Sequence, residues 1–259
     1  MPDLAKWAGY LIDAEAAREA VEPITDAEPQ LSVEDAYRIQ ALGVENKVAA
    51  GELVVGAKLG LTSKAKQTAM HVDQPVYGVL TSGMVLDFEQ PLDCSKLIHP
   101  RVEPEIVFVL DDDLVGPDVT GHDVLAVTRY LTCGLEVIDS RYADFRFTHP
   151  DVVADNTSAS RFVLGPQRRR PCELDDLALV GCTLQIDNRV VATAAGAAVL
   201  GHPAAAVALL ANWLTEQGGR LERGAIILSG GLTNAVPIAP GVCVSATFGG
   251  MGTVTLRGV

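Results

Sequence analysis

Three glutamates occupy apolar stretches of this 259-residue sequence, where carboxylates are costly. Glu103 and Glu105 stand two residues apart in HPRVEPEIVFVL, and Glu136 lies in CGLEVID. On a strand, residues two apart point to the same face, about 7 Å from each other, so Glu103 and Glu105 would form a pair. Three oxygen ligands without a nearby His or Cys suit a hard cation such as Mg²⁺ or Mn²⁺. The alternative is a solvent-facing strand edge that carries acids for solubility.

Lys58 is the one charged residue within the Gly-punctuated apolar stretch Leu53–Thr62. A lysine in such surroundings is a candidate acid, base or anion clamp. The alternative is a lysine at a strand edge whose ammonium group extends to solvent. Both alternatives stay open on the local sequence alone.

Composition excludes some functions and favours others. The net charge of -13 argues against binding nucleic acid, which depends on Lys and Arg at phosphates. No uninterrupted apolar run reaches the roughly 18 to 20 residues that span a bilayer, and the first residues do not resemble a signal peptide. The five cysteines are scattered without a CxxC pair, which favours reduced thiols. We therefore expect a cytoplasmic protein that does not bind nucleic acid.

The elements that must position these residues follow from periodicity. Helical spacing predicts one helix over residues 3–21 and a second that starts at Ser32 and ends at Gly51. Further helices are predicted after Thr120, through residue 132, and after His202. Short apolar runs between turns predict strands at 54–59, 102–110, 135–138, 161–164, 178–186, 225–229, 242–248 and 253–257.

The predicted elements indicate an α+β fold. We expect residues 1–53 to form a helical N-terminal cap and residues 54–259 a β-rich catalytic domain, with one continuous domain as the alternative. The length of the chain allows either arrangement.

Several segments resemble one known family along nearly the whole chain. They are GAKLGLTSKAK, HPRVEPEI, LEVIDSRY, VVADNTSASRFVLG, AGAAVLGHP and LSGGLTNAVPIAPG. The chain resembles the 4-oxalocrotonate decarboxylases and 2-hydroxypenta-2,4-dienoate hydratases, within the fumarylacetoacetate hydrolase superfamily. The resemblance implies a mixed β-roll or barrel like the C-terminal domain of that superfamily, and a lyase in the meta-cleavage degradation of aromatics. It also implies a homo-oligomer, a complex with the pathway hydratase, or both.

The resemblance assigns roles to particular residues. It implies that Glu103, Glu105 and Glu136 hold Mg²⁺, with Mn²⁺ as the alternative, and that Lys58 is catalytic. It places a set of further residues around a 2-oxo dicarboxylate substrate: Leu61, Val76, Arg141, Ser160, Arg161 and Thr233. For Arg161, a surface ion pair is the alternative.

Local comparisons favour the decarboxylase branch. Hydratases typically carry an aspartate in the loop after the lysine, where this chain has Val76 in DQPVYG. The segments LIHP, DSRYADFRF, SASRF and GGLTNAVP are also more similar to decarboxylases. The expected reaction is loss of CO₂ from 2-oxohex-3-enedioate, with the metal acting as a Lewis acid on the developing dienolate.

Three alternatives stay open from the sequence. The first is the hydratase reaction on 2-hydroxypenta-2,4-dienoate. The second is a Schiff base at Lys58, since desolvated lysines can act in this way. The third is a non-catalytic partner that stabilises a hydratase.

Overall fold

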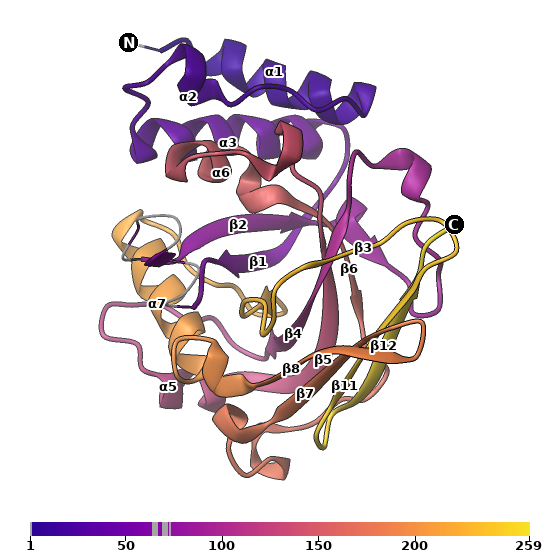
Figure 1. Cartoon of the computed structure of the whole chain (residues 1–259). Helices are drawn as coiled ribbons and strands as arrows, with labels where there is room; N and C mark the ends of the chain where they lie inside the picture. The colour runs from indigo at the N-terminus through magenta and orange to yellow at the C-terminus, as the bar shows by residue number, and fades with distance from the viewer. Residues whose placement is uncertain (1, 64–66, 69–71, 73) are drawn as a thin grey trace.

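The chain forms two β-sheets with helices on their outer sides (Figure 1). The structure, a computed structural model, describes residues 2–63, 67–68, 72 and 74–259. The helices are α1 Leu4–Ala17, α2 Ile24–Ala27, α3 Val33–Ala49, α5 Gly121–Ala126, α6 His149–Ala154 and α7 Pro203–Glu216. The strands are β1 Val54–Gly60, β2 Val76–Thr81, β3 Val85–Leu86, β4 Arg101–Leu110, β5 Thr128–Ile138, β6 Ala159–Leu164, β7 Gly181–Ile186, β8 Arg189–Ala195, β9 Ile226–Leu228, β10 Val236–Pro237, β11 Cys243–Phe248 and β12 Gly252–Arg257.

The larger sheet carries the predicted site. Its strands run in the order β2-β1-β9-β4-β5-β6-β3, with β10 paired to β4. The central strands β4 and β5 are antiparallel over their whole length, with Glu103 opposite Glu136. The second sheet, β12-β11-β7-β8, packs on β5. The main core lies between these layers and takes Ile106 and Phe108 from one face of β4, which leaves the other face for the glutamates.

The N-terminal helices begin where side chains can cap them. Asp3 accepts a hydrogen bond from the Lys6 amide at the start of α1, and Ser32 accepts one from the Asp35 amide at the start of α3. Helices α1, α3 and α6 pack together above β1 and β2 (Figure 1) and enclose a second apolar cluster. The division at residue 53 into a cap and a catalytic domain stays a prediction.

Helix α7 is part of the core. The segment Gly196–Glu216 that contains it is long and apolar enough to cross a membrane by length and composition alone. However, Ala204, Val207 and Leu210 are buried in the main core, and α7 packs against α5 and β1. Its apolar character is thus explained by burial within the protein.

The predicted elements differ from the structure mainly in the middle of the chain. The helix predicted through residue 132 is wrong beyond Ala126, because β5 begins at Thr128 and pairs with β4. Tertiary pairing of Thr, Tyr and Leu side chains outweighs the helical spacing here. Val76, expected in a loop, begins strand β2. Strand β8 and helix α6 were not predicted. The α+β class is confirmed.

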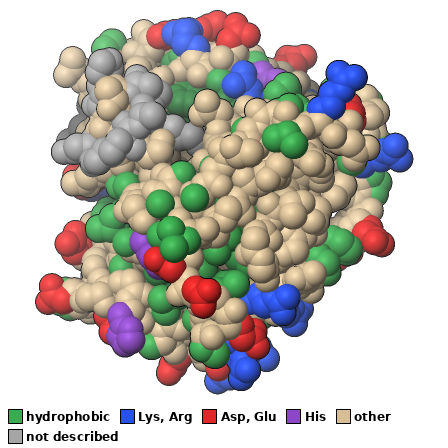
Figure 2. Space-filling model, turned by 60° about the horizontal axis from the view of Figure 1, so that its bottom comes forward, with side chains coloured by type: hydrophobic (Ala, Val, Ile, Leu, Met, Phe, Trp, Pro, Cys, Tyr) green, Lys and Arg blue, Asp and Glu red, His purple; other side chains and the backbone are tan. Residues whose placement is uncertain are grey.

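Charged groups on the surface are dispersed. On the face drawn in Figure 2, the described Lys and Arg side chains stand apart, and acidic side chains lie among them. Such a surface offers no continuous track for a phosphate backbone on that face.

Candidate active site

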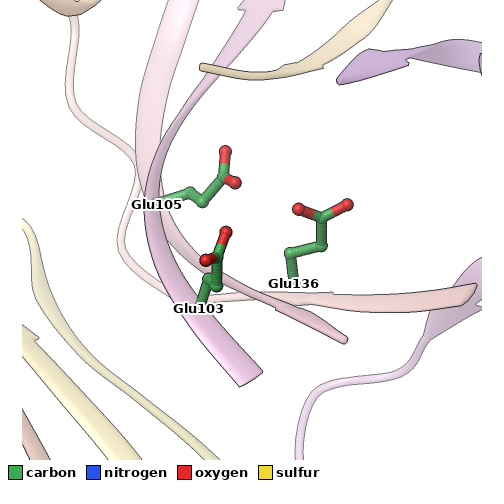
Figure 3. A group of neighbouring side chains, drawn as sticks. All are labelled: Glu103, Glu105 and Glu136. Atoms are coloured by element: carbon green, nitrogen blue, oxygen red, sulfur yellow. The ribbon is translucent and has the colours of Figure 1, made fainter. Parts of the chain in front are cut away.

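Three carboxyl groups converge from two neighbouring strands of the larger sheet (Figure 3). Glu103 and Glu105 come from β4, and Glu136 comes from β5. One ligand oxygen from each lies within 4.8 Å of the others. Glu103 is 8% exposed, Glu136 1% and Glu105 0%. The pairing of β4 with β5 therefore joins the third glutamate to the predicted pair.

This geometry excludes the solvent-facing strand edge. Strand β4 lies between β5 and β9 in the sheet, so it is an interior strand. Glu105 Oε1 and Glu136 Oε2 are buried and have no hydrogen-bond partner among the described residues. Leaving such oxygens buried without a partner is costly. A divalent cation would supply the missing partner, and an all-carboxylate set is the type that hard cations prefer.

Burial and mutual repulsion disfavour the ionised forms of these carboxyl groups. Burial, followed by the charge of Glu136, raises the pKa of Glu105 well above its usual value. Burial also raises the pKa of Glu136, and Lys58 opposes that rise. Both directions follow from desolvation and like-charge repulsion. A bound cation would reverse them by favouring the ionised forms.

Lys58 lies beside the carboxylates and not at a solvent-exposed edge. Its side chain is 3% exposed, and Nζ lies 2.9 Å from Glu136 Oε1. Nζ also donates a hydrogen bond of 3.1 Å to the Thr157 carbonyl oxygen. Strand β1 is interior, between β2 and β9. The alternative of a lysine extending to solvent is therefore wrong.

A glycine pair after β9 brings backbone close to the carboxylates. The Gly230 amide donates a 2.6 Å hydrogen bond to Glu105 Oε2, and Gly230 has a φ of +118°. A Cβ at Gly231 would lie 2.3 Å from Glu103 Oε2. A side chain at Gly231 would therefore displace the Glu103 carboxylate, and one at Gly230 would collide with Thr62. The local sequence signalled this only as two adjacent glycines in LSGGLTNAVP.

The Thr157 carbonyl reaches Lys58 because of an unusual turn. Asn156, Thr157 and Ser158 all have positive φ values, of 47°, 53° and 58°. Such values are uncommon for residues with side chains, above all for a β-branched threonine. The Asn156 side chain stabilises the turn by accepting from the Val79 amide at 2.8 Å and donating to the Val79 carbonyl at 2.9 Å. Sequence reasoning gave no role to these residues.

Val76 and Leu61 flank the lysine strand. Val76 pairs with Gly60 of β1, and Gly78 pairs with Lys58, so these four residues share one face of the sheet. Val76 is 1% exposed and belongs to the apolar cluster beneath α1 and α3. Leu61 follows β1 directly, is half-buried and has a φ of 56°. The rest of the motif after it includes residues 64–66, which lie outside the described residues.

Ser160 and Thr233 are buried on two segments that border the site. Ser160 lies at an irregularity in the pairing of β5 with β6 and is 4% exposed. Thr233 is 8% exposed and follows the glycine pair by two residues. Its hydroxyl donates to the Asn234 carbonyl at 3.0 Å. Their predicted role as substrate anchors stays a prediction.

Neither predicted arginine joins the carboxylate cluster. Arg161 pairs with Val137, so its side chain lies on the face of the sheet opposite to Glu136. Its Nη1 donates to the Ser160 carbonyl at 2.8 Å. Arg141 is buried and forms an ion pair with Asp155. The structure shows neither guanidinium group facing the carboxylates.

Two motifs that favoured the decarboxylase branch contact each other. Asp139 accepts hydrogen bonds from the amides of Ile98 and His99, at 2.9 and 2.7 Å. The His99 ring nitrogen Nε2 lies 2.8 Å from the Ser140 carbonyl oxygen, and the ring stacks against Phe145. The segment LIHP thus fixes the chain that follows β5.

The fold and the site together define a class of enzyme. A curled sheet that presents three buried carboxylates and one buried lysine on the same side is suited to hold a divalent cation and to act on a small molecule. No family model matches the chain.

Comparisons with known proteins identify the family. The chain is 41% identical over 250 residues to a 4-oxalocrotonate decarboxylase of Pseudomonas putida, which covers 96% of this chain and 94% of that protein. It is 40% identical to a 2-hydroxyhexa-2,4-dienoate hydratase of Comamonas testosteroni, over 95% of this chain and 94% of that one. A solved 4-oxalocrotonate decarboxylase from Pseudomonas putida G7, complexed with magnesium and adipate, superimposes with a TM-score of 0.96 and 40% identity, covering 99% and 97% of the two chains.

The chain belongs to the family of 4-oxalocrotonate decarboxylases and related dienoate hydratases. A fumarylpyruvate hydrolase from Pseudomonas aeruginosa, 14% identical, shares the fold at a TM-score of 0.63 over 78% of this chain and 88% of that one. This likeness confirms the predicted fold of the fumarylacetoacetate hydrolase superfamily.

Proposed function

We propose that the protein decarboxylates 2-oxohex-3-enedioate to 2-hydroxypenta-2,4-dienoate, with a divalent cation held by Glu103, Glu105 and Glu136. The observation that carries the proposal is that Glu105 Oε1 and Glu136 Oε2, buried beside Lys58, have no hydrogen-bond partner among the described residues. The similarity to decarboxylases over nearly the whole chain supports the choice of reaction. The magnesium in the solved relative supports Mg²⁺, and Mn²⁺ is the alternative.

The chemistry requires a place for negative charge. When bound, the cation supplies positive charge to the 2-oxo acid end of the substrate. Loss of CO₂ breaks the bond between C5 and C6, and its electron pair moves through the C3–C4 double bond to the keto oxygen. Protonation of that oxygen gives the hydroxydienoate. Stabilising the developing charge lowers the barrier, and each 1.4 kcal/mol corresponds to roughly tenfold in rate.

Lys58 is the residue of this chain that acts on that charge. An ammonium group has three donors. One is directed to Thr157 and one to Glu136, which leaves the third for the substrate oxygen. A donor held in place before the reaction stabilises charge without reorganisation.

Val76 determines what happens after decarboxylation. Its apolar side chain shares the face of Lys58 and Gly78. An apolar group cannot relay a proton to or from water, whereas an acid there could activate water for addition to the diene. This favours release of the dienoate over its hydration. Ser160 and Thr233 are proposed to contact the substrate's carboxylates.

Two separate incubations test the function. The enzyme with Mg²⁺ receives 2-oxohex-3-enedioate in one and 2-hydroxypenta-2,4-dienoate in the other, and CO₂ and the dienoate chromophore are followed. We expect CO₂ from the first substrate and no hydration of the second. Hydration of the second without CO₂ from the first would establish the hydratase instead, which the 40% identical hydratase relative makes the specific alternative.

Chelation distinguishes the metal mechanism from a Schiff base. We expect EDTA to abolish CO₂ release and Mg²⁺ to restore it. Borohydride with substrate should leave the enzyme active if Lys58 donates a hydrogen bond. Activity that survives EDTA but is lost with borohydride would contradict the metal mechanism.

The finer partner and location assignments are also proposals. We propose that the chain self-associates or binds the hydratase that consumes its product, and that it works in the cytoplasm. Gel filtration with and without that hydratase tests the association. A protein that is inactive with both substrates but stabilises the hydratase would be the non-catalytic partner.

A further inference from the structure

A cavity separate from the carboxylate cluster lies between the N-terminal helices and the start of β6. Its volume is about 320 Å³. Leu11 and Glu15 of α1 and Ile39 of α3 contribute walls, and Arg141 and Asp155 contribute the floor. Lys58 and the three site glutamates do not line it. The cavity is therefore a second space within the protein.

The sequence keeps this space open at a cost in helix stability. Gly43 lies in the interior of α3 and lines the cavity. A Cβ added there would have no described atom within 4 Å. Glycine is a poor residue for a helix interior, and neither sterics nor a positive φ requires it here. A larger side chain would fit and would fill the cavity.

The charged side chains that line the cavity already have partners, and two sets of them form ion pairs. Lys47 Nζ lies 2.7 Å from Glu15 Oε1, and Arg141 is paired with Asp155. Glu52 accepts a hydrogen bond from the Gly83 amide at 3.2 Å. A charged guest would have to break one of these pairs or remain without a counter-charge, and both are unfavourable. An uncharged guest avoids that penalty.

Arg141 offers a polar group to such a guest. Arg141 has five N–H donors. Four of them reach described acceptors: the carboxylate and carbonyl of Asp155 and the carbonyls of Asp139 and Ala159. The fifth, on Nη2, has no described acceptor, although the side chain is 5% exposed. A hydroxyl oxygen could accept this hydrogen bond and would carry no charge.

The volume sets the size of the guest. An apolar cavity of about 150 Å³ is enough for benzene, so 320 Å³ holds one substituted ring. Leu11, Ile12, Ile39 and Val44 offer it apolar walls. We propose that this cavity binds a small uncharged aromatic alcohol or phenol, with its ring between α1 and α3 and its hydroxyl group at Arg141.

Titration calorimetry on the full chain tests the proposal. It compares three probes of similar shape, on the wild type and on two glycine variants. Benzyl alcohol should bind saturably, with a Kd on the order of 1 mM or lower. Benzoate and benzylammonium should bind at least tenfold more weakly because each carries a charge. Gly43→Leu should abolish binding of benzyl alcohol. Gly9→Leu is the matched control, since Gly9 is also a helix-interior glycine with open space but does not line the cavity.

The outcomes are distinct. No saturable binding to the wild type, equal binding to Gly43→Leu, or tighter binding of a charged probe would each overturn the proposal. Circular dichroism shows whether both leucine variants fold. A measurement without variants gives a second test: bound benzyl alcohol should show intermolecular NOEs to the methyl groups of Leu11 and Ile39. NOEs from other methyl groups alone would place the ligand elsewhere.

Discussion

Two groups of buried charges in this protein are built in opposite ways. Among the described residues, Glu103, Glu105 and Glu136 gather beside Lys58, and Glu105 Oε1 and Glu136 Oε2 have no hydrogen-bond partner. Arg141 and Asp155 form a one-to-one pair in which the guanidinium also donates to backbone carbonyls. We call the first group unbalanced, because oxygens of Glu105 and Glu136 lack a partner among the described residues. We call the second group balanced, because four of the five N–H donors of Arg141 have acceptors.

The difference indicates what each group does. Buried ion pairs often contribute little net stability, but loss of one partner is strongly destabilising. A saturated pair can therefore hold backbone segments together, as Arg141 does for the chain around Asp155 and Ala159. An unbalanced group is costly in the absence of a ligand, so its presence points to a function that requires one.

Replacing one acid of the unbalanced group should have the largest effect. We expect Glu105→Gln to lower kcat/KM for decarboxylation about a thousandfold, ~4 kcal/mol, because a cation ligand is lost. Without metal, the same variant should unfold at a higher temperature than the wild type, because a buried carboxylate with a raised pKa becomes neutral. Thermal unfolding in EDTA and metal titration measure the two effects. Glu45→Gln, at an exposed residue, is the control.

A fall in both activity and metal-free stability would contradict this comparison. It would mean that the Glu105 carboxylate stabilises the fold and does not destabilise the metal-free protein. Unchanged activity would contradict the proposed ligand set.

Loss of the ion pair in the balanced group, Arg141 with Asp155, should lower the stability of the protein. We expect Arg141→Met to lower the free energy of unfolding by roughly 3 kcal/mol, because Asp155 is left buried and unpaired. Urea denaturation measures the loss, and a double-mutant cycle with Asp155→Asn tests whether the two residues act together. Metal affinity should stay within twofold of the wild type. Additive effects of the two substitutions would show that the ion pair is not the origin of the loss.

The sequence predicted the unbalanced group better than the balanced one. The same-face pair of Glu103 and Glu105 follows from strand periodicity, which is local. That Glu136 completes it depends on the register of β4 with β5, which no local pattern specifies. The predicted helix through residue 132 even overlapped the start of β5. The family resemblance supplied what periodicity could not.

Arginine roles were the least predictable part of the site. An arginine near candidate ligands is an attractive carboxylate anchor, yet Arg141 is engaged by Asp155, fourteen residues along the chain. Arg161 is placed on the opposite face by its pairing with Val137. Both outcomes depend on tertiary contacts, as does the turn at Asn156 that directs a carbonyl to Lys58.

The balanced pair should also give the protein a pH dependence. Burial raises the pKa of Asp155 to about 6, although Arg141 opposes the rise. The folded state then binds a proton more tightly than the unfolded state, so this residue's contribution to stability is full below about pH 4 and is lost as pH rises through 6. We expect the stability difference between wild type and Asp155→Asn to fall across that window in urea titrations from pH 4 to 8. A difference that rises with pH would contradict the raised pKa.

The smallest effect should come from the glycine that borders the unbalanced group. A methyl group at position 231 would lie 2.3 Å from Glu103 Oε2, so Gly231→Ala must displace that carboxylate. We expect metal affinity to weaken about tenfold, or ~1.4 kcal/mol. Calorimetric titration with Mg²⁺ measures the change. Gly181→Ala, where a Cβ meets no described atom within 4 Å, should bind Mg²⁺ as the wild type does. Equal affinity in both variants would mean that the position of Glu103 is not set by the glycine pair, and that the cation depends mainly on Glu105 and Glu136.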